Sequence, residues 1–371
     1  MRRFLIICFY LASFGVHAQF EFFGHPDRME LVRRGGDFIY NLEVDSANVY
    51  IEKAREVLPN HPVVPLMEGL QILWLHIPVL DSVFETFIAK MDEAVKLSEE
   101  LPGGIKKNDE ALFFALAARG LMAEYFADVG QYMRAVGEAN KAYGLVKRGF
   151  EKTDSINEFL FTSGLYNYFR VKYPEINPVY KPFVWLFKNG DKKLGLEQLD
   201  EATRNTIISR IEANIYISYI YLRYEDTPEK AQEYLSYLVE QYPNNSYLIT
   251  KYLESLRSDV YFAEAPLDLI IQLQQDENAY SKMAGFIFRG LYIEKVLNRP
   301  EEAVQYYARG IDIGRQIPNH GEFYKSLGYL GMGRITRKDK PGTSSAYLKK
   351  SLEYAETKDV KREARALLRE E

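Results

Sequence analysis

Apolar residues recur three and four positions apart along nearly the whole chain from about Asp27 onward. This spacing is the period of an amphipathic α-helix that buries one face. Two apolar runs, 111–116 and 215–220, would also suit strands if read alone. Alanine-rich amphipathic stretches such as 132–147 flank them, however, and no two-residue hairpin signal lies between. The pattern therefore predicts an all-α protein.

Clusters of proline, glycine and small polar residues interrupt this pattern at fairly even intervals. They lie near residues 59–62, 102–104, 153–155, 226–228, 243–246, 298–300 and 340–342. Several place a capping residue before Pro or Glu, as in Asp226-Thr227-Pro228-Glu229, which favours the first turn of a new helix. The breaks predict about fourteen to eighteen helices joined by short loops.

The first residues form a separate unit. Arg2 and Arg3 precede an apolar run from Phe4 to Val16, and small or aliphatic residues stand at Val16 and Ala18. This arrangement is typical of a secretory signal peptide, and the apolar run is shorter than the roughly 20 residues that span a bilayer. We predict a signal peptide over 1–18, cleaved after Ala18, followed by a short segment over 19–26, with retention as an anchor as the alternative. The mature chain is then periplasmic or secreted.

The only cysteine, Cys8, lies inside this signal segment. Ile7 before it is bulky, whereas a lipoprotein signal requires a small residue there, so we expect no lipidation. The mature chain would hold no cysteine, which excludes disulfides, thiolate metal sites and a cysteine nucleophile. Its stability must come from packing.

Charge excludes one class of partner. The net charge of −5 is spread along the chain, with acidic and basic residues mixed at helical spacing and no basic stripe. Nucleic-acid binders carry such a stripe, so we expect no DNA or RNA partner.

Some positions recur at a fixed interval. Three pairs of residues lie 34 positions apart: Ala231 with Ala265, Leu235 with Leu269, and Leu222 with Leu256. Several longer segments, which we call units, place small and bulky residues in one recurring order. The best of them contains Leu31, Gly35, Phe38, Ala47, Ile51, Ala54 and Pro59. Others contain Ile215, Leu222, Ala231, Leu235, Leu238 and Pro243; Ala123, Phe126, Ala135, Ala139 and Ala142; Gly290, Ile293, Ala303, Tyr307 and Gly310; and Gly331, Ser344, Leu348 and Ser351.

This order of residues resembles the tetratricopeptide repeat family, whose units are pairs of antiparallel helices. The resemblance implies an α-solenoid, a right-handed superhelix over 27–371 in which each pair packs only on its neighbours. The polar segment 343–371 would be its capping helix or pair. Regions 65–101 and 164–202 fit the pattern poorly. The small residues that would let helices approach closely are Gly35, Ala47, Ala54, Ala123, Ala135, Ala142, Ala231, Ala265, Gly290, Ala303 and Gly331.

The same resemblance implies a concave surface lined by the first helix of each unit. Carried onto the matched units, its positions are Met29, Val32, Gly36 and Ile39; Ala213, Tyr216, Ile220 and Arg223; and Tyr247, Thr250, Glu254 and Arg257. The last two sets predict a partner-binding groove that contains Tyr216, Arg223, Tyr247, Glu254 and Arg257. A solvated helix face is the alternative. The Lys and Asn set with which some family members clamp a C-terminal carboxylate is absent there.

A second segment is similar to the tetratricopeptide repeat protein 39 family. It comprises Gly164-Leu165-Tyr166, Pro174, Phe187-Lys188-Asn189-Gly190-Asp191 and Gly195-Leu196-Glu197-Gln198-Leu199. That family's cellular role is poorly defined, so this resemblance adds little about function.

Catalytic and metal motifs are missing from the sequence. His25, His61, His76 and His320 do not pair at ligand spacing. The glycines of 328–333 follow no strand and have the wrong order for a phosphate-binding turn, which favours helix packing. We therefore expect no catalytic residue, metal or cofactor.

The hypothesis that fits best is an exported binding or scaffolding protein for a protein or peptide partner in the cell envelope, without catalysis. The alternative is a secreted enzyme built as a ring of helix pairs and acting on carbohydrate, which a closed ring with two buried carboxylates facing one cleft would favour. A structural subunit of a membrane-associated assembly is a third option, peripheral and not spanning once the signal is cleaved.

Overall fold

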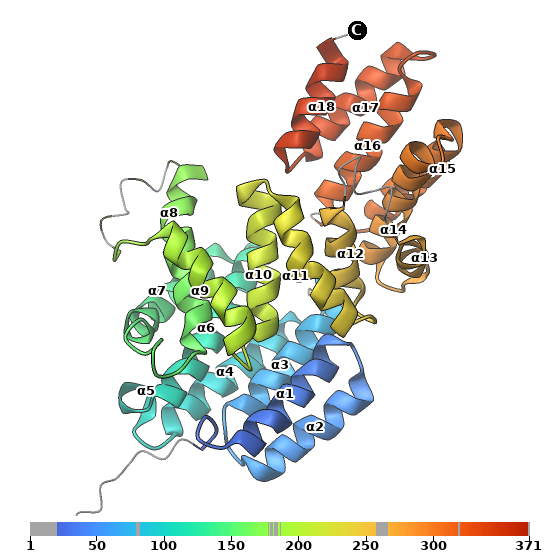
Figure 1. The fold of residues 1–371 in the computed structure, drawn as a ribbon. Helices are drawn as coiled ribbons and strands as arrows, with labels where there is room; N and C mark the ends of the chain where they lie inside the picture. Colours follow the sequence, from blue (N-terminus) through green and yellow to red (C-terminus); the bar gives the residue numbers. More distant parts are fainter. Residues whose placement is uncertain are drawn as a thin grey trace, which may run out of the picture.

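The computed structural model describes residues 21–78, 82–176, 178, 181, 185, 187–256, 266–317 and 320–369. Within these residues the chain forms eighteen α-helices and no strand (Figure 1), so the all-α prediction is confirmed. The predicted signal peptide, Arg257 and Ala265 lie outside the described residues.

The helices follow one another with short connections. Their bounds are α1 (Pro26–Tyr40), α2 (Val44–Val57), α3 (Val63–His76), α4 (Phe84–Glu100), α5 (Gly104–Lys107), α6 (Asp109–Asp128), α7 (Tyr132–Gly149), α8 (Phe159–Ile176), α9 (Lys192–Asn205), α10 (Arg210–Ile220), α11 (Pro228–Gln241), α12 (Ser246–Ser255), α13 (Leu267–Gln275), α14 (Ala279–Leu291), α15 (Pro300–Gly314), α16 (Glu322–Thr336), α17 (Pro341–Tyr354) and α18 (Lys358–Arg369). Single π-helical turns, Tyr221–Glu225 and Tyr292–Val296, extend α10 and α14. The two apolar runs that could have been strands lie in α6 and α10.

Neighbouring helices pack as pairs. The pairs are α1 with α2, α3 with α4, α6 with α7, α8 with α9, α10 with α11, α12 with α13, α14 with α15, and α16 with α17. The single-turn α5 precedes α6, and α18 packs on α16 and α17 at the end of the array. The segment expected to cap the array therefore comprises nearly all of α17, the second helix of the last pair, together with α18.

Small residues stand where helices approach closely. A Cβ on Gly35 would lie 2.4 Å from the Cε of Met67, and one on Gly290 or Gly331 would lie 2.7 or 2.4 Å from the ring of Tyr307. Most alanines of the repeat pattern are fully or nearly buried: Ala47, Ala54, Ala135, Ala142, Ala231 and Ala303. Ala123 is partly buried and Ala139 is exposed, so these two positions do not mark a tight helix contact. Gly328 and Gly333 also lie within α16 and pack against side chains. The glycines of 328–333 thus belong to a helix.

The two regions that fitted the repeat pattern poorly form ordinary pairs. Residues 65–101 supply α3 and α4, and 164–202 supply parts of α8 and α9. The crossing of α8 and α9 depends on two glycines, because a Cβ on Gly195 would lie 2.5 Å from the backbone nitrogen of Tyr168 and one on Gly164 would lie 2.9 Å from the carbonyl oxygen of Gly195. Backbone atoms cannot move aside as a flexible side chain can, so the approach requires glycine.

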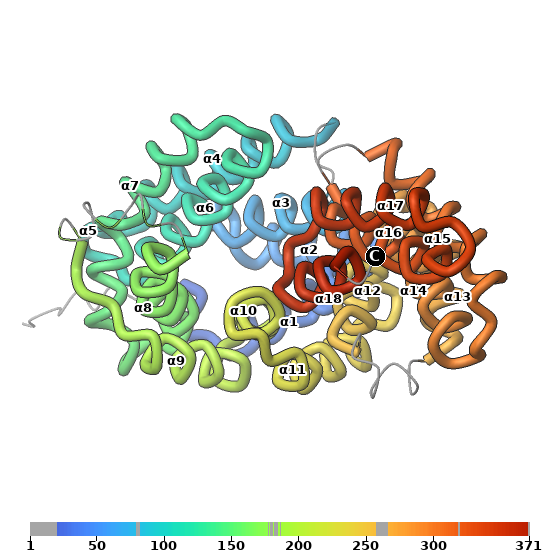
Figure 2. The backbone as a smooth tube through the Cα atoms, turned by 90° about the horizontal axis from the view of Figure 1, so that it is seen from above, coloured from blue at the N-terminus to red at the C-terminus, as the bar shows by residue number. Residues whose placement is uncertain are grey.

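The first helix pair also contacts helices far along the chain. The hydroxyl of Tyr40 donates to Glu212 Oε1 at 2.8 Å, and Asn245 Nδ2 donates to the carbonyl of Tyr40 at 2.7 Å. An ion pair of 2.9 Å joins Arg210 to Asp37. Seen from above, α1 and α3 lie beside α10 and α12, so the helices from α1 to α12 form one closed turn (Figure 2). The expectation that each pair packs only on its neighbours is therefore wrong. Polar groups near the end of α1 form hydrogen bonds and an ion pair with residues at the starts of α10 and α12.

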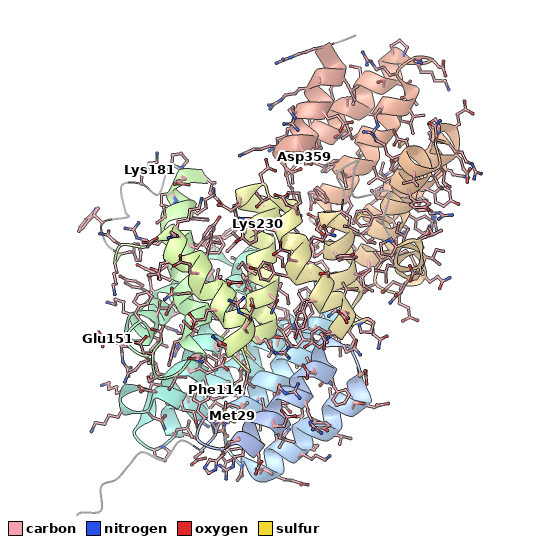
Figure 3. All side chains as sticks on the ribbon, in the orientation of Figure 1. Met29, Phe114, Glu151, Lys181, Lys230 and Asp359 are labelled. Atoms are coloured by element: carbon pink, nitrogen blue, oxygen red, sulfur yellow. The ribbon has the colours of Figure 1, made fainter. Side chains whose placement is uncertain are left out.

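A buried glutamate fixes the start of the described chain to this turn. Glu110 accepts hydrogen bonds from the backbone nitrogens of Phe22 and Phe23 at 3.0 and 2.8 Å, and its other oxygen lies 2.9 Å from His61 Nε2. Phe114, labelled in Figure 3, is fully buried beside His61 and Phe22. His61 thus has a structural partner.

Two features are absent from the part of the chain that the structure describes. None of the helices in the described ranges is long and apolar enough to cross a membrane. Within the same ranges, no group of three or more His, Cys, Asp and Glu side chains could hold a metal ion.

Candidate binding cavity inside the closed turn

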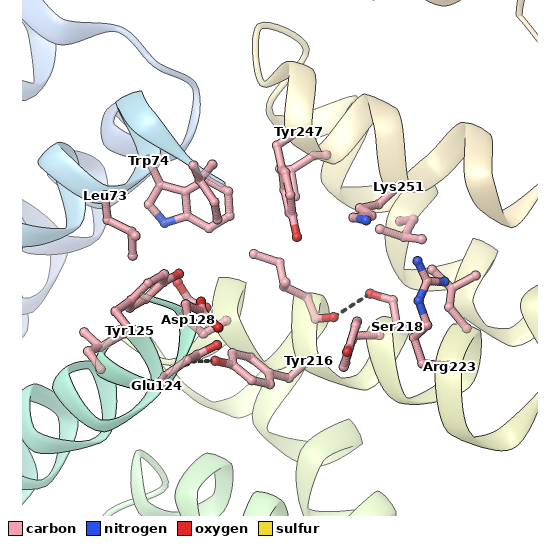
Figure 4. Close-up of a pocket in the computed structure, with 18 residues that line it drawn as sticks. Leu73, Trp74, Glu124, Tyr125, Asp128, Tyr216, Ser218, Arg223, Tyr247 and Lys251 are labelled. Atoms are coloured by element: carbon pink, nitrogen blue, oxygen red, sulfur yellow. Dashed lines mark hydrogen bonds between the residues drawn. The ribbon is translucent and has the colours of Figure 1, made fainter. Parts of the chain in front are cut away.

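A pocket of about 260 Å³ lies inside the closed turn, where α3, α6, α10 and α12 face one another. Leu73 and Trp74 of α3, Glu124 and Tyr125 of α6, and Tyr216 of α10 line it (Figure 4). Tyr247 and Lys251 of α12 complete the wall opposite α6. We call this space the polar chamber.

A second pocket of about 400 Å³ adjoins it between α6, α7, α8 and α10. Its walls are mostly hydrocarbon and aromatic, and include Phe113, Leu116, Phe161, Leu165 and Phe169. We call this space the apolar chamber. Four residues line both chambers and therefore form the partition between them: Leu121, Glu124, Glu212 and Tyr216.

The first carboxylate of the partition is Glu124. Its Oε2 accepts the hydroxyl hydrogen of Tyr216 (Figure 4). Burial raises the pKa of Glu124 to about 7, against the opposing effect of the Tyr216 hydrogen bond, and the charges of Asp128 and Glu212 add to the rise. Glu124 is partly buried and lines both chambers.

The second carboxylate is Glu212. Burial also raises the pKa of this group, while the hydroxyl of Tyr40 and the nearby indole of Trp74 act in the opposite direction. Asp128, on the polar chamber, likewise has a raised pKa because it is buried, an effect that His320 partly offsets. Among the residues that the structure describes, no lysine or arginine forms an ion pair with Glu124 or Glu212. Two enclosed carboxylates therefore face one cavity without a cation to balance them.

Aromatic rings surround these carboxylates. The ring of Trp74 lies 5.1 Å from that of Tyr40 and packs edge to face against Tyr247 at 5.9 Å. Only 4% of Trp74 is exposed, and its buried Nε1 has no hydrogen-bond partner. In Figure 4 this nitrogen points toward the centre of the pocket. The indole of Trp74 thus lies near Glu212 without forming a hydrogen bond to it. Its N–H is an unsatisfied donor at the wall of the polar chamber.

The opposite end of the polar chamber is basic, but its charges are already balanced. Arg223 is bonded to the fully buried Glu254, and Lys251 lies 3.3 Å from the other oxygen of that carboxylate. Tyr324 donates to the same oxygen at 2.9 Å. Burial alone would lower the pKa of Lys251, yet the charge of Glu254 raises it above its usual range.

Arg223, Lys251 and Glu254 form what we call the basic cluster, which also joins distant parts of the chain. Arg223 Nε lies 3.6 Å from Glu356, between α17 and α18, and its guanidinium lies 4.9 Å from the ring centroid of Phe323 in α16. The cluster thus fastens the last helices to α10 rather than offering a free cation to the chamber.

The structure brings together most of the predicted groove. Tyr216, Arg223 and Tyr247 line the polar chamber, whereas Glu254 is buried behind it in the basic cluster. Arg257 lies outside the described residues. The remaining positions of the predicted concave surface do not line either chamber: Met29, Val32, Gly36, Ile39, Ala213, Ile220 and Thr250.

Sequence reasoning missed the two carboxylates, the tryptophan and Lys251. Helical spacing could have found two of these, since Glu212 lies four residues before Tyr216 and Lys251 four residues after Tyr247, on the same helix faces. Trp74 lies in a region that fitted the repeat poorly, and no pattern pointed to Glu124.

No protein-family model matches this chain, and no curated protein matches it.

Proposed function

We propose that the mature protein is an exported helical-repeat protein of the tetratricopeptide type, which binds a peptide or protein partner in the cell envelope through the two chambers of its closed turn. The observation that carries this proposal is the unsatisfied partition. Two enclosed carboxylates without a cation and an indole N–H without an acceptor are costly in an empty fold. A partner that supplies the missing groups would offset that cost.

The shape of the site supports a binding role. Concave sites in proteins typically combine apolar walls with a few convergent polar groups. The apolar chamber supplies hydrocarbon surface next to Glu124 and Glu212, and the ring of Tyr247 supplies contact area at low entropic cost.

Affinity capture from the native cell envelope, followed by mass spectrometry, tests the proposal. The bait is the mature protein, compared with Gly120→Leu and Gly144→Leu. Both glycines lie within helices and a Cβ on either meets nothing within 4 Å, but only Gly120 lines the apolar chamber. We expect partners that Gly120→Leu loses and Gly144→Leu retains. A partner set unaffected by Gly120→Leu would contradict the proposal.

Hydrolysis of a carbohydrate is the second candidate, favoured by the same pair of carboxylates. Glycosidases use two carboxyl groups at one cleft, one of them an acid whose raised pKa keeps it protonated near neutral pH. Glu124 has such a pKa, and it lines the polar chamber together with Glu212.

A reducing-sugar assay distinguishes this candidate from the first. The mature protein is incubated with a panel of polysaccharides beside Glu124→Gln and Glu212→Gln. Release of reducing ends by the wild type, abolished in both variants, would establish catalysis. Absence of release across the panel would leave binding as the function.

A further inference from the structure

Three chemical demands meet at the partition between the chambers. The carboxylates of Glu124 and Glu212 have no cationic partner in the described part of the chain, because Lys251 and Arg223 on the polar chamber pair with Glu254. The indole N–H of Trp74 is buried, points into the polar chamber and calls for an acceptor. The apolar chamber on the other side of the partition calls for hydrocarbon.

One common chemical group meets all three demands at once. The first residue of a peptide carries an ammonium on its Cα, a carbonyl oxygen one carbon away and a side chain on that same Cα. Capture of a chain terminus by fixed polar groups is an established mode of peptide recognition. A lone alkylamine would satisfy the carboxylates and the apolar chamber, but it would leave the indole of Trp74 without an acceptor.

We infer that this cavity binds the free amino terminus of a peptide whose first residue is apolar, an inference that rests on the proposed binding function. The ammonium lies against Glu124 and Glu212, the first carbonyl accepts from Trp74, and the first side chain enters the apolar chamber. The rest of the peptide leaves through the polar chamber, past Tyr247 toward α12.

The charges around this position suit an ammonium. Glu124, Glu212 and Asp128 face it from α6 and α10, together with the hydroxyls of Tyr216 and Tyr40. Lys251 and Arg223, at the far end of the polar chamber, face Glu254. His320 acts on Asp128 at the edge of this group. A free carboxylate in place of the ammonium would meet the like charges of Glu124 and Glu212, so the site discriminates between the two ends of a peptide.

Titration calorimetry with short synthetic peptides tests this inference. The probe is leucyl-alanyl-alanine amide, and the matched control is the same peptide with an acetylated amino terminus. Acetylation removes the charge and leaves the rest of the ligand intact. We expect it to weaken binding about tenfold to a hundredfold, the usual value of a hydrogen bond to a charged group. Replacing leucine with aspartate at the first position should weaken binding comparably.

Variants of the protein provide the second arm. Glu212→Gln should weaken binding of the free peptide about tenfold and leave the affinity of the acetylated peptide nearly unchanged. Trp74→Phe keeps a ring and removes the N–H, and should weaken both peptides. Glu56→Gln makes the same charge change on the exposed face of α2 and should have no effect.

The outcomes separate this inference from the proposal beneath it. Equal binding of the free and acetylated peptides, or equal binding by Glu212→Gln and the wild type, would overturn the inference. If neither peptide binds while affinity capture recovers partners that Gly120→Leu loses, the inference fails and the binding function stands. If Gly120→Leu changes nothing in either experiment, both fail.

Discussion

Replacing Glu124 with glutamine isolates the energetic effect of the enclosed carboxyl. The side chain keeps its size, and the amide oxygen can still accept the hydroxyl hydrogen of Tyr216. The substitution removes only the ionisable group, so its effect on stability must depend on pH.

The sign and size follow from the raised pKa. The pKa of Glu124 rises from 4.5 to about 7 on folding. Below pH 4.5 the carboxyl is protonated in both the folded and the unfolded chain, and the wild type and Glu124→Gln should be equally stable. As the pH rises to about 7, the unfolded chain ionises first and the wild type loses stability. One pKa unit corresponds to 1.36 kcal/mol, so Glu124→Gln should be more stable than the wild type by about 3 kcal/mol at pH 8.

Urea unfolding at pH 4.5, 6 and 8 measures this difference directly. Comparing the two proteins at each pH cancels the titration of groups that do not interact with Glu124, and Glu56→Gln on an exposed helix face controls for net charge. The difference in unfolding free energy should grow with pH and level off above pH 7. A difference that is constant with pH, or that favours the wild type at pH 8, would refute the assignment of Glu124 as an enclosed carboxyl without a cation.

Three further predictions concern packing, anchoring and binding. Gly195→Ala should lower the free energy of unfolding by about 1–3 kcal/mol, because its Cβ would lie 2.5 Å from the backbone nitrogen of Tyr168. Gly144→Ala, with open space around its Cβ, should instead raise the free energy of unfolding by up to about 1 kcal/mol in the same urea titration. Equal effects of the two substitutions would contradict the packing account. Glu110→Ala should lower the free energy of unfolding by about 3 kcal/mol or more and expose the amino-terminal segment to limited proteolysis. An unchanged cleavage pattern would show that Glu110 does not hold this segment in place. Binding of a free amino terminus should be strongest between about pH 7 and 8, since the peptide amine loses its charge above that range and Glu124 gains a proton below it; affinity that rises steadily from pH 5 to 9 would argue against this pairing.

The all-α fold could be predicted because it depends on local signals. The spacing of apolar residues and the proline and glycine breaks act within a few positions along the chain, and they led to helices such as α6 and α10. The small residues of the repeat pattern lie where helices meet, as Gly35 does against Met67. The α8 and α9 pair escaped the pattern because a long connection separates its two packing glycines, Gly164 and Gly195.

The closed turn could not be predicted because it depends on contacts between residues far apart in the sequence. Tyr40 and Glu212 are separated by 172 positions, and neither belongs to a motif. The curvature that brings them together is the sum of small rotations between successive helix pairs, which the irregular spacing of this chain does not reveal. For the same reason the sequence predicted Tyr216 and Tyr247 as groove residues but did not bring Trp74 and Glu124 to the same cavity.

The indole N–H signals of the protein test the central claim most directly. The chain has two tryptophans, Trp74 at the cavity wall and Trp185, which is 78% exposed. A two-dimensional ¹H–¹⁵N spectrum therefore contains a probe and an internal control, assigned by Trp74→Phe. Adding leucyl-alanyl-alanine amide should move the Trp74 signal downfield as its N–H gains an acceptor, and leave the Trp185 signal in place. A Trp74 signal that stays fixed while the peptide binds would contradict the account.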